Sequence, residues 1–385
     1  MKKVLIIGPG HPLRGGLASF NQRLAKEFIN QGDSCEIFSF SLQYPSFLFP
    51  GKTQYSSEPA PADLKIHAAI NSINPINWIR VGNRIKKMRP DLIVVRYWLP
   101  FMGPALGTIL RRVRKNKHTR IVCIADNVIP HEKRPGDRIF TRYFVKSCDA
   151  FVTMSEKVME DLQQFGNRWP VQLVRHPLYD NFGEPESREK ARQTLGFSSE
   201  EKILLFFGFI RNYKGLDLLL RAMADPRIRE QNIRLLVAGE FYEDGAPYRS
   251  LIAELGIQDL LILHTDFIPD SKVRDYLCSA DAVVQPYRNA TQSGVTPLAY
   301  HFEIPMIVTR VGGLPDLVPH ERAGLVVEPD PTDIANGILR FYQTGRQHFL
   351  PALREEKKKY SWERLVHSIR ELAAGSKRLP TSQNH

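Results

Sequence analysis

The sequence is poor in cysteine and has no long apolar run. Its four cysteines, Cys35, Cys123, Cys148 and Cys278, are far apart, and three lie in or beside apolar segments. We therefore expect buried thiols rather than disulfides or metal ligands. The N-terminal MKKVLIIG has too short an apolar part for a signal peptide, and no later run approaches the ~20 residues of a membrane-spanning helix. We expect a cytoplasmic protein.

Acidic residues are scarce in the first half of the chain. Residues 1–182 hold 27 Lys and Arg against 14 Asp and Glu, whereas residues 183–385 hold 26 against 27. The excess is densest in RIKKMR at 84–89 and in RRVRKNKHTR at 111–120. These runs are either solvated helix faces or a surface for anionic lipid headgroups or another anionic partner. Nucleic acid is the weaker candidate, because no RNP-like, zinc-finger or helix-turn-helix signature accompanies the charge.

Length and alternation predict two α/β domains. The 385 residues exceed what one core usually holds, and short apolar strands alternate with helix-like segments, which indicates mainly parallel sheets. The polar stretch 181–201 is the expected linker, and 42–74 is expected as a long loop, either mobile or simply packed. We expect Rossmann-like domains at 1–182 and 183–355, a final helix at 356–376 packed on the first domain, and a disordered tail at 377–385.

The stretch 281–318 carries the strongest local pattern. An apolar run at 282–284 ends at a proline, a polar loop follows, and a helix is predicted at 296–302. A second apolar run, at 306–308, leads to Gly312, Gly313 and another short helix. Two parallel strands with loops at the same sheet edge result. Ligands of such sheets bind at the carboxyl ends of the strands, where helix N-termini attract anions, so we predict a phosphate-bearing ligand.

Two cations stand in the loop after the second domain's first strand. Gly208 ends that strand, Gly215 opens a helix, and Arg211 and Lys214 lie between them. Such a pair can neutralise a diphosphate and the charge that develops as it leaves, so no metal is required. The alternative is that both are ordinary solvated surface cations.

The first loop of the first domain is rich in glycine. Gly8 and Gly10 follow the first strand, and Gly15 and Gly16 precede the first helix. A dinucleotide fingerprint needs a third glycine where this chain has Leu13, so nicotinamide binding is disfavoured. Gly15 and Gly16 either let a substrate approach the backbone closely or form a plain turn.

Taken together, these segments resemble the retaining glycosyltransferases of family 4, which have the two-domain GT-B fold. The glycine pair before the first helix, GFIRNYKGLDLLL at 208–220, VAGE at 237–240, ADAVVQPY at 280–287 and VTRVGGLPDLV at 308–318 match the family's layout in order and spacing. The resemblance implies transfer of a sugar from a nucleotide-diphosphate sugar to an acceptor hydroxyl, with retained configuration and without a metal or other cofactor. Arg211 and Lys214 would then hold the donor's diphosphate.

The donor-sugar loop departs from the family's pattern. Members commonly carry a Glu-x7-Glu pair, and the matching positions here are Ala290 and Leu298. The loop ATQSGVTPLAY looks like that of a branch of the family without this pair, and Glu240 could serve the nucleoside instead. By the resemblance, Gln292 and Ser293 would sit in the sugar-binding loop. Backbone amides or hydroxyls would be presented to the phosphates and sugar by Ser293, Gly294, Val295 and Thr296.

Two further candidates follow the strand at 121–125, namely Asp126 and His131. The family often has a histidine at the position of Asp126, near the donor sugar's hydroxyls. Asp126 either orients the sugar or the acceptor, or caps a turn. His131 either shuttles the acceptor proton or is satisfied within its loop.

The sequence as a whole predicts a cytoplasmic or membrane-peripheral retaining glycosyltransferase of hexosyl type, acting on a glycan or lipid-linked acceptor in cell-surface polysaccharide or glycolipid synthesis. Contact with an anionic membrane through the basic first half belongs to this prediction. Three alternatives stand beside it: a GT-B sugar-nucleotide epimerase, a non-catalytic nucleotide-sugar-binding protein, which the missing carboxylates favour, and a membrane or polyanion binder.

Overall fold

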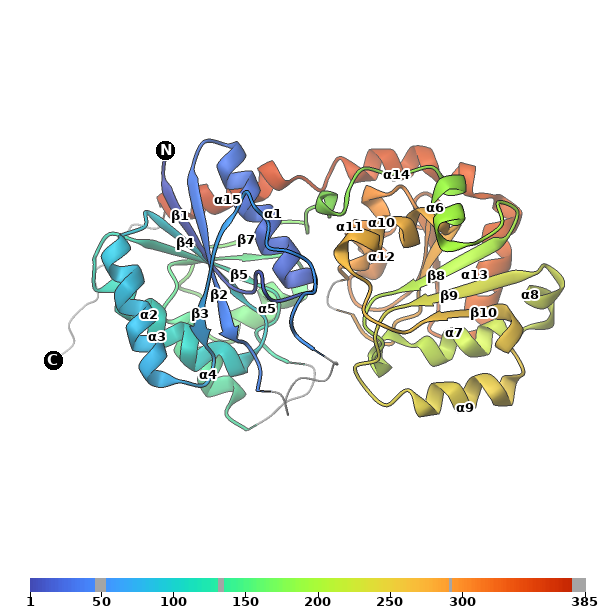
Figure 1. Cartoon of the computed structure of the whole chain (residues 1–385), viewed down its shortest axis with the longest axis horizontal. Coiled ribbons are helices and arrows are strands. Elements are labelled where there is room, and N and C mark those ends of the chain that lie inside the picture. The colour runs from blue at the N-terminus through green and yellow to red at the C-terminus, as the bar shows by residue number, and fades with distance from the viewer. Residues whose placement is uncertain (46–52, 131–134, 291–292, 376–385) are drawn as a thin grey trace. The chain divides into compact units, whose positions relative to one another are not determined.

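A computed structural model describes residues 1–45, 53–130, 135–290 and 293–375. The chain divides into two compact units (Figure 1). The first unit contains the chain up to Arg175 and again from Ser361, and the second contains His176–Tyr360. In the described residues, no helix combines the length and apolar character needed to cross a membrane.

The first unit is built on a parallel sheet with the strand order β3-β2-β1-β4-β5-β6-β7. Its central strands are buried almost completely, because helices cover both faces of a parallel sheet. In register, Val4 lies opposite Cys35 on one side and Leu92 on the other. The strands are β1 Lys3–Ile7, β2 Ser34–Leu42, β3 Lys65–Asn71, β4 Leu92–Tyr97, β5 Arg120–Ala125, β6 Ala150–Thr153 and β7 Val171–Leu173.

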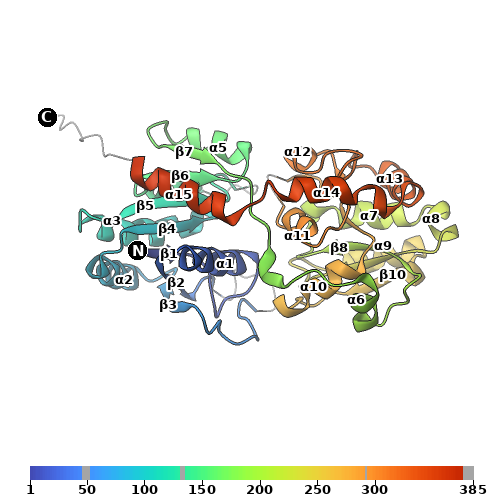
Figure 2. The same cartoon turned by 90° about the horizontal axis from the view of Figure 1, so that it is seen from above.

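Helices flank this sheet (Figures 1 and 2). They are α1 Gly16–Asn30, α2 Pro75–Met88, η2 Pro100–Met102, α3 Gly103–Arg114, α4 Asp137–Val145, α5 Glu156–Gln163 and the final helix α15 Trp362–Gly375. Local signals explain their starts: the Asn74 side chain caps α2, and Ser155 caps α5. The final helix packs on α1, since the rings of Trp362 and Phe20 lie 4.8 Å apart.

The segment predicted as a long loop at 42–74 contains β3, so that prediction is wrong for residues 65–71. This strand, KIHAAIN, pairs in parallel with β2 at the edge of the sheet. Most of its residues are only partly buried or exposed, so it lacks the continuous apolar run by which the central strands are recognised.

The second unit has a parallel sheet with the strand order β10-β9-β8-β11-β12-β13. The chain runs outward from β8 to β10 and then returns to place β11 on the other side of β8, so the topological switch point lies between β8 and β11. The strands are β8 Lys202–Phe207, β9 Ile233–Ala238, β10 Leu261–His264, β11 Ala282–Gln285, β12 Met306–Thr309 and β13 Gly324–Val327.

The helices of the second unit are mostly short. The single-turn elements are η3 Asp180–Phe182, η4 Asn212–Lys214, η5 Gln258–Leu260 and η6 Arg346–His348. The α-helices are α6 Arg188–Leu195, α7 Leu216–Met223, α8 Pro226–Glu230, α9 Ala246–Leu255, α10 Asp270–Ser279, α11 Val295–His301, α12 Leu314–Leu317, α13 Pro331–Thr344 and α14 Leu350–Lys357.

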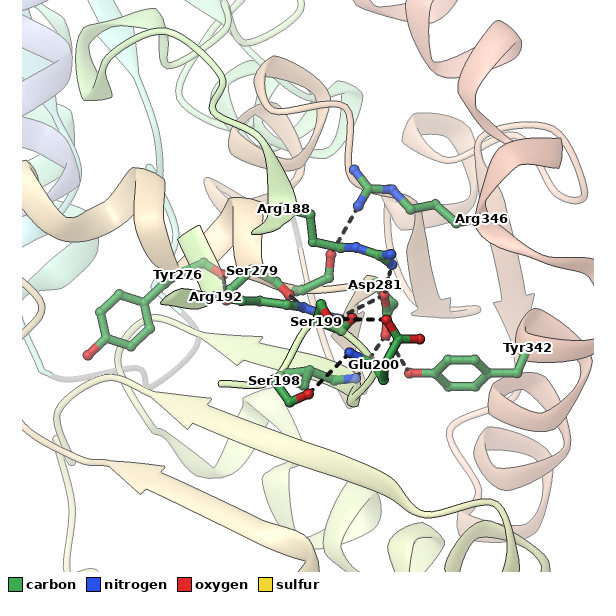
Figure 3. A network of polar contacts seen from close by, with 12 residues as sticks. Arg188, Arg192, Ser198, Ser199, Glu200, Tyr276, Ser279, Asp281, Tyr342 and Arg346 are labelled. Atoms are coloured by element: carbon green, nitrogen blue, oxygen red, sulfur yellow. Dashed lines mark hydrogen bonds and ion pairs between the residues drawn. The ribbon is translucent and has the colours of Figure 1, made fainter. Parts of the chain in front are cut away.

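A buried ion-pair network anchors α6, which lies inside the stretch expected as linker (Figure 3). The Asp281 carboxylate accepts hydrogen bonds from Arg188 at 2.8 Å and Arg192 at 3.1 Å. It also accepts one from the Ile203 amide at 2.8 Å and one from the Tyr342 hydroxyl at 3.2 Å. The network therefore fixes α6 and α13 at the amino ends of β8 and β11, the sheet edge opposite the switch-point loops.

We predict that Asp281→Ala lowers the free energy of unfolding by about 3–5 kcal/mol, because it leaves the Arg192 guanidinium, 1% exposed, without its carboxylate. Urea denaturation followed by circular dichroism measures the change. Glu328→Ala is the matched control, since Glu328 pairs with Arg310 at an exposed site and should cost less than ~1 kcal/mol. Equal losses for the two variants would contradict the prediction.

Candidate functional site

Groups from two loops of the second unit converge at the carboxyl ends of β8 and β11. A Cβ atom placed on Gly208, directly after β8, would lie 3.1 Å from Lys214 Nζ and 3.9 Å from Val295 Cγ2. Lys214 belongs to the loop after β8, and Val295 begins α11 after β11. We call this place the switch-point site, formed by Gly208, Lys214 and the segment 293–296.

Lys214 is the strongest electrostatic feature of the switch-point site. It is 9% exposed, and its Nζ lies 5.7 Å from the centre of the Tyr287 ring. Burial, followed by the charge of Arg211, lowers the pKa of Lys214 to about 8. Among the described residues, no carboxylate contributes to this shift. A desolvated ammonium in such surroundings attracts an anion.

Arg211 belongs to the same loop and reaches toward the loop after β9. Its guanidinium carbon lies 5.1 Å from the centre of the Tyr242 ring, a cation–π arrangement. The Tyr242 ring in turn stacks on Phe209, with the centroids 3.9 Å apart, and Phe209 faces Phe267 at 6.4 Å. Aromatic rings from the ends of three neighbouring strands thus form a surface beside Arg211, suited to a planar ligand group.

Gln285 organises the segment 293–296 from the end of β11. Its side chain is 1% exposed; its Oε1 accepts a hydrogen bond from Ser293 Oγ at 2.6 Å, and its Nε2 donates to Thr296 Oγ1 at 3.2 Å. Ser293 Oγ also accepts from the Val295 amide at 3.2 Å. The hydroxyls of Ser293 and Thr296, which are 5% and 0% exposed, therefore hold the loop, and Gly294 is the exposed residue of the segment.

Sequence reasoning did not single out Gln285. The signal was present, because a glutamine between Val284 and Pro286 interrupts an otherwise apolar strand, and a buried polar side chain needs partners.

Two glycines keep the loops in backbone contact. A Cβ on Gly215, whose φ is 66°, would lie 2.0 Å from the Pro286 carbonyl oxygen. A Cβ on Gly312, whose φ is 51°, would lie 1.6 Å from the Ala290 carbonyl oxygen. Only glycine permits both the conformation and the approach, so the loops after β8, β11 and β12 form one continuous edge.

Glu240 also lies at this edge. It follows β9 and is 2% exposed, and its carbonyl accepts a hydrogen bond from the Ile210 amide at 2.9 Å. The structure thus places Glu240 beside the loop that carries Phe209 and Arg211.

The first unit holds the remaining described candidates. Gly15, with φ 96°, precedes α1 and Gly16 is its first residue. Asp126 follows β5 and is 8% exposed, and both its carboxylate oxygens accept hydrogen bonds from Arg96 at 2.5 Å. Arg96 is itself 2% exposed and lies over the Phe20 ring at 3.9 Å. A carboxylate bound in this way orients a neighbour or contributes charge more readily than it accepts a proton.

His131 and Gln292 lie outside the described residues. Within the residues that the structure does describe, no three His, Cys, Asp or Glu side chains form a group that could hold a metal ion.

Each of the two units matches a profile of a known protein family. The family profile described as Glycosyl transferases group 1 matches residues 201–344, and that described as Glycosyltransferase Family 4 matches residues 14–178. A D-inositol 3-phosphate glycosyltransferase of Saccharomonospora viridis is 29% identical over 272 residues, which cover 67% of this chain and 57% of that protein. The chain thus matches little more than half the length of this relative.

Solved structures share the fold over nearly the whole chain. A sucrose-phosphate synthase from Thermosynechococcus elongatus superimposes with a TM-score of 0.74 at 16% identity, covering 97% of this chain and 100% of the other. The Anabaena protein Alr3699/HepE, solved with UDP, superimposes with a TM-score of 0.71 at 15% identity, covering 97% and 99%. The predicted α/β GT-B fold and the predicted family are confirmed: the chain belongs to the family 4 glycosyltransferases, the glycosyl transferases group 1.

Proposed function

We propose that this protein transfers a hexosyl residue from a nucleotide-diphosphate sugar to a hydroxyl of a glycan or lipid-linked acceptor, with retention and without a metal ion. The observation that carries the proposal is the buried Lys214 ammonium, which Arg211 accompanies in the same loop at the switch point. A diphosphate would supply the negative charge that no described carboxylate provides to Lys214.

The nucleoside would lie along the neighbouring strands. Phe209, Tyr242 and Phe267 provide ring faces for a base, and the buried Glu240 stands where a carboxylate can bind ribose hydroxyls. Support comes from the solved structures of the Anabaena relative, which hold UDP and UDP-glucose.

The transfer step needs no protein nucleophile. The bond between the sugar's anomeric carbon and the diphosphate oxygen breaks, and the acceptor oxygen bonds to the same face of that carbon. The acceptor proton passes to the leaving diphosphate, whose added charge Lys214 and Arg211 stabilise. Asp126, held by Arg96, would orient sugar or acceptor hydroxyls, and Gly15 and Gly16 would let the substrate approach the backbone.

The proposed setting is the synthesis of cell-surface polysaccharide or glycolipid at the inner face of the membrane. The relatives' names describe acceptors of different kinds, an inositol phosphate and glycogen, and a further solved structure belongs to a glycosyltransferase of lipopolysaccharide biosynthesis. The acceptor class is therefore best identified by experiment with a mixed pool.

A second candidate is a non-catalytic nucleotide-sugar binder. The observation that favours it is the presence of Ala290 and Leu298, 4% and 6% exposed, at the two positions where the family's common pattern predicts carboxylates. Such a protein would bind the donor tightly but transfer no sugar to any acceptor. An epimerase, in contrast, would change the donor with no acceptor present.

We predict that one nucleoside diphosphate from a panel raises the melting temperature strongly, and that Lys214→Ala raises its Kd about 10–100-fold through loss of ~1.5–3 kcal/mol of charge-assisted hydrogen bonding. Calorimetric titration gives the Kd. Arg221→Ala, which removes an exposed cation of α7, is the matched control. An unchanged Kd in Lys214→Ala would show that the diphosphate does not bind at Lys214.

We predict that affinity for the same nucleotide falls as the pH rises above about 8, the pKa of Lys214 in the free protein. The bound diphosphate favours the ammonium and raises this pKa, so affinity is full below the free pKa and declines up to tenfold per pH unit until the bound pKa is reached. Titrations between pH 7 and pH 10 test this. Lys214→Arg, which stays charged, should show a flat profile; an equally steep profile would assign the titration to another group.

We predict that Asp126→Asn leaves nucleotide affinity within about twofold, because the nucleotide's proposed contacts lie in the second unit, but lowers transfer about 100-fold. Transfer of labelled sugar to a pool of glycan and lipid-linked acceptors measures the effect. Asp161→Asn is the control, since Asp161 is another buried carboxylate of the first unit, paired with Lys157. Equal rates of transfer in the two variants would show that Asp126 does not act on the substrates.

A further inference from the structure

Three consecutive helices of the first unit are almost free of acidic residues. The helix α2 contains four Lys and Arg, α3 three and α4 two, whereas the only carboxylate among them is Asp137 at the start of α4. An exposed helix layer ordinarily mixes both signs of charge. This layer is therefore either a binding surface for a negatively charged partner or a positively charged surface that faces only water.

The three helices form one continuous surface. They lie together on one side of the first unit (Figure 1) and pack in the order α2, α3, α4. Glycines allow the close approach: a Cβ on Gly82 would lie 2.8 Å from Arg112 Cβ, and one on Gly103 would lie 2.5 Å from the Phe140 carbonyl oxygen. Side chains of α2 and α4 therefore belong to the same face of the molecule.

Part of the positive charge on this layer is structural. Arg111 donates to Ser147 Oγ at 2.6 Å and to the Tyr143 carbonyl at 2.6 Å, and its guanidinium lies 3.6 Å from the centre of the Tyr143 ring. Arg114 pairs with Asp149 at 3.6 Å. Arg111 and Arg114 are therefore not simply solvated cations of a helix face, because their side chains join α3 to the end of α4.

The outer face of α4 is different. Arg138, Arg142 and Lys146, four residues apart along α4 and its C-cap, are exposed. Ile139 on the same face is 71% exposed, and Phe140 is 39% exposed. On this face the structure gives no ion pair to the three cations within its described residues, whereas exposed arginines of the second unit such as Arg227 and Arg229 are paired.

The start of α2 also has exposed isoleucines next to an exposed cation. Ile76 is 69% exposed and Ile79 42% exposed, and Arg80 beside them is exposed. Large aliphatic side chains left in water, surrounded by cations, are costly unless they meet an apolar phase. Nucleic acid would satisfy the cations but not the isoleucines. A bilayer with anionic headgroups satisfies both, because its charged surface lies directly above hydrocarbon.

We propose that the outer face of α2 and α4, with Ile76, Ile79, Arg138, Ile139 and Arg142 at its centre, docks on an anionic phospholipid bilayer. Both helices follow strands of the parallel sheet, β3 and β5, so their first turns lie at its carboxyl edge. Ile76 and Ile139 stand in those first turns, at the edge that Asp126 occupies, and Ile79 follows in the second turn of α2. Together with the proposed function, on which this step rests, the docked face brings a lipid-linked acceptor to the edge of the first unit that carries Asp126.

The test is flotation of the full chain with vesicles of phosphatidylcholine, with and without one third phosphatidylglycerol. Wild type is expected to float only with the anionic vesicles. Arg138→Gln with Arg142→Gln should lower the partition coefficient about 25-fold, about fivefold per cation, and Ile139→Ser about tenfold. Added salt should weaken binding by the wild type.

Matched controls lie in the second unit. Leu263→Ser changes a residue that is 45% exposed, and Arg221→Gln changes an exposed cation; both should bind vesicles as the wild type does. Equal binding to neutral vesicles, no binding by the wild type, wild-type binding by the α4 variants, or binding to heparin alone would each overturn the proposal. Nucleotide binding without vesicle binding would overturn this proposal alone, and vesicle binding without nucleotide binding would overturn the proposed function alone.

Discussion

A buried ammonium that lacks a carboxylate partner among the described residues is the constraint on which the second unit's site depends. Burial and the neighbouring Arg211 both disfavour the charged form of Lys214, so the site is electrostatically incomplete. The loops around it lie close together, since a Cβ on Gly215 would lie 2.0 Å from the Pro286 carbonyl oxygen. A bound diphosphate would complete the charge balance at Lys214, as expected of an anion site.

The absence of acidic groups extends to the neighbouring loop. Ala290 and Leu298, the two positions at which the family's common pattern predicts carboxylates, are apolar and buried here. The neutral amide of Gln285 fixes the loop instead, through Ser293 and Thr296. A loop held by neutral groups adds no negative charge beside the diphosphate, so the positive potential of Lys214 and Arg211 is preserved.

The sequence predicted the parts of the fold that continuous apolar runs mark. The strand predicted at 282–284 is β11, and the helix predicted at 296–302 is α11, shifted by one residue. The edge strand β3 and the polar helix α6 were not predicted, because half-exposed strands and a helix anchored by Arg192 lack those runs. Lys214 was found from its loop, whereas its burial and the hydrogen bonds of Gln285 arise from tertiary contacts that spacing does not reveal.

The return of the final helix to the first unit affects the order in which the chain can assemble. Among the described residues, the second unit is formed by His176–Tyr360 alone, whereas the first is completed only by residues after Tyr360. During synthesis from the N-terminus, the second unit is therefore complete in sequence before the first has its last helix. Until Trp362 packs against Phe20, the side of α1 that faces the final helix stays uncovered, so the first unit gains its last apolar contacts only after the second unit has been synthesised.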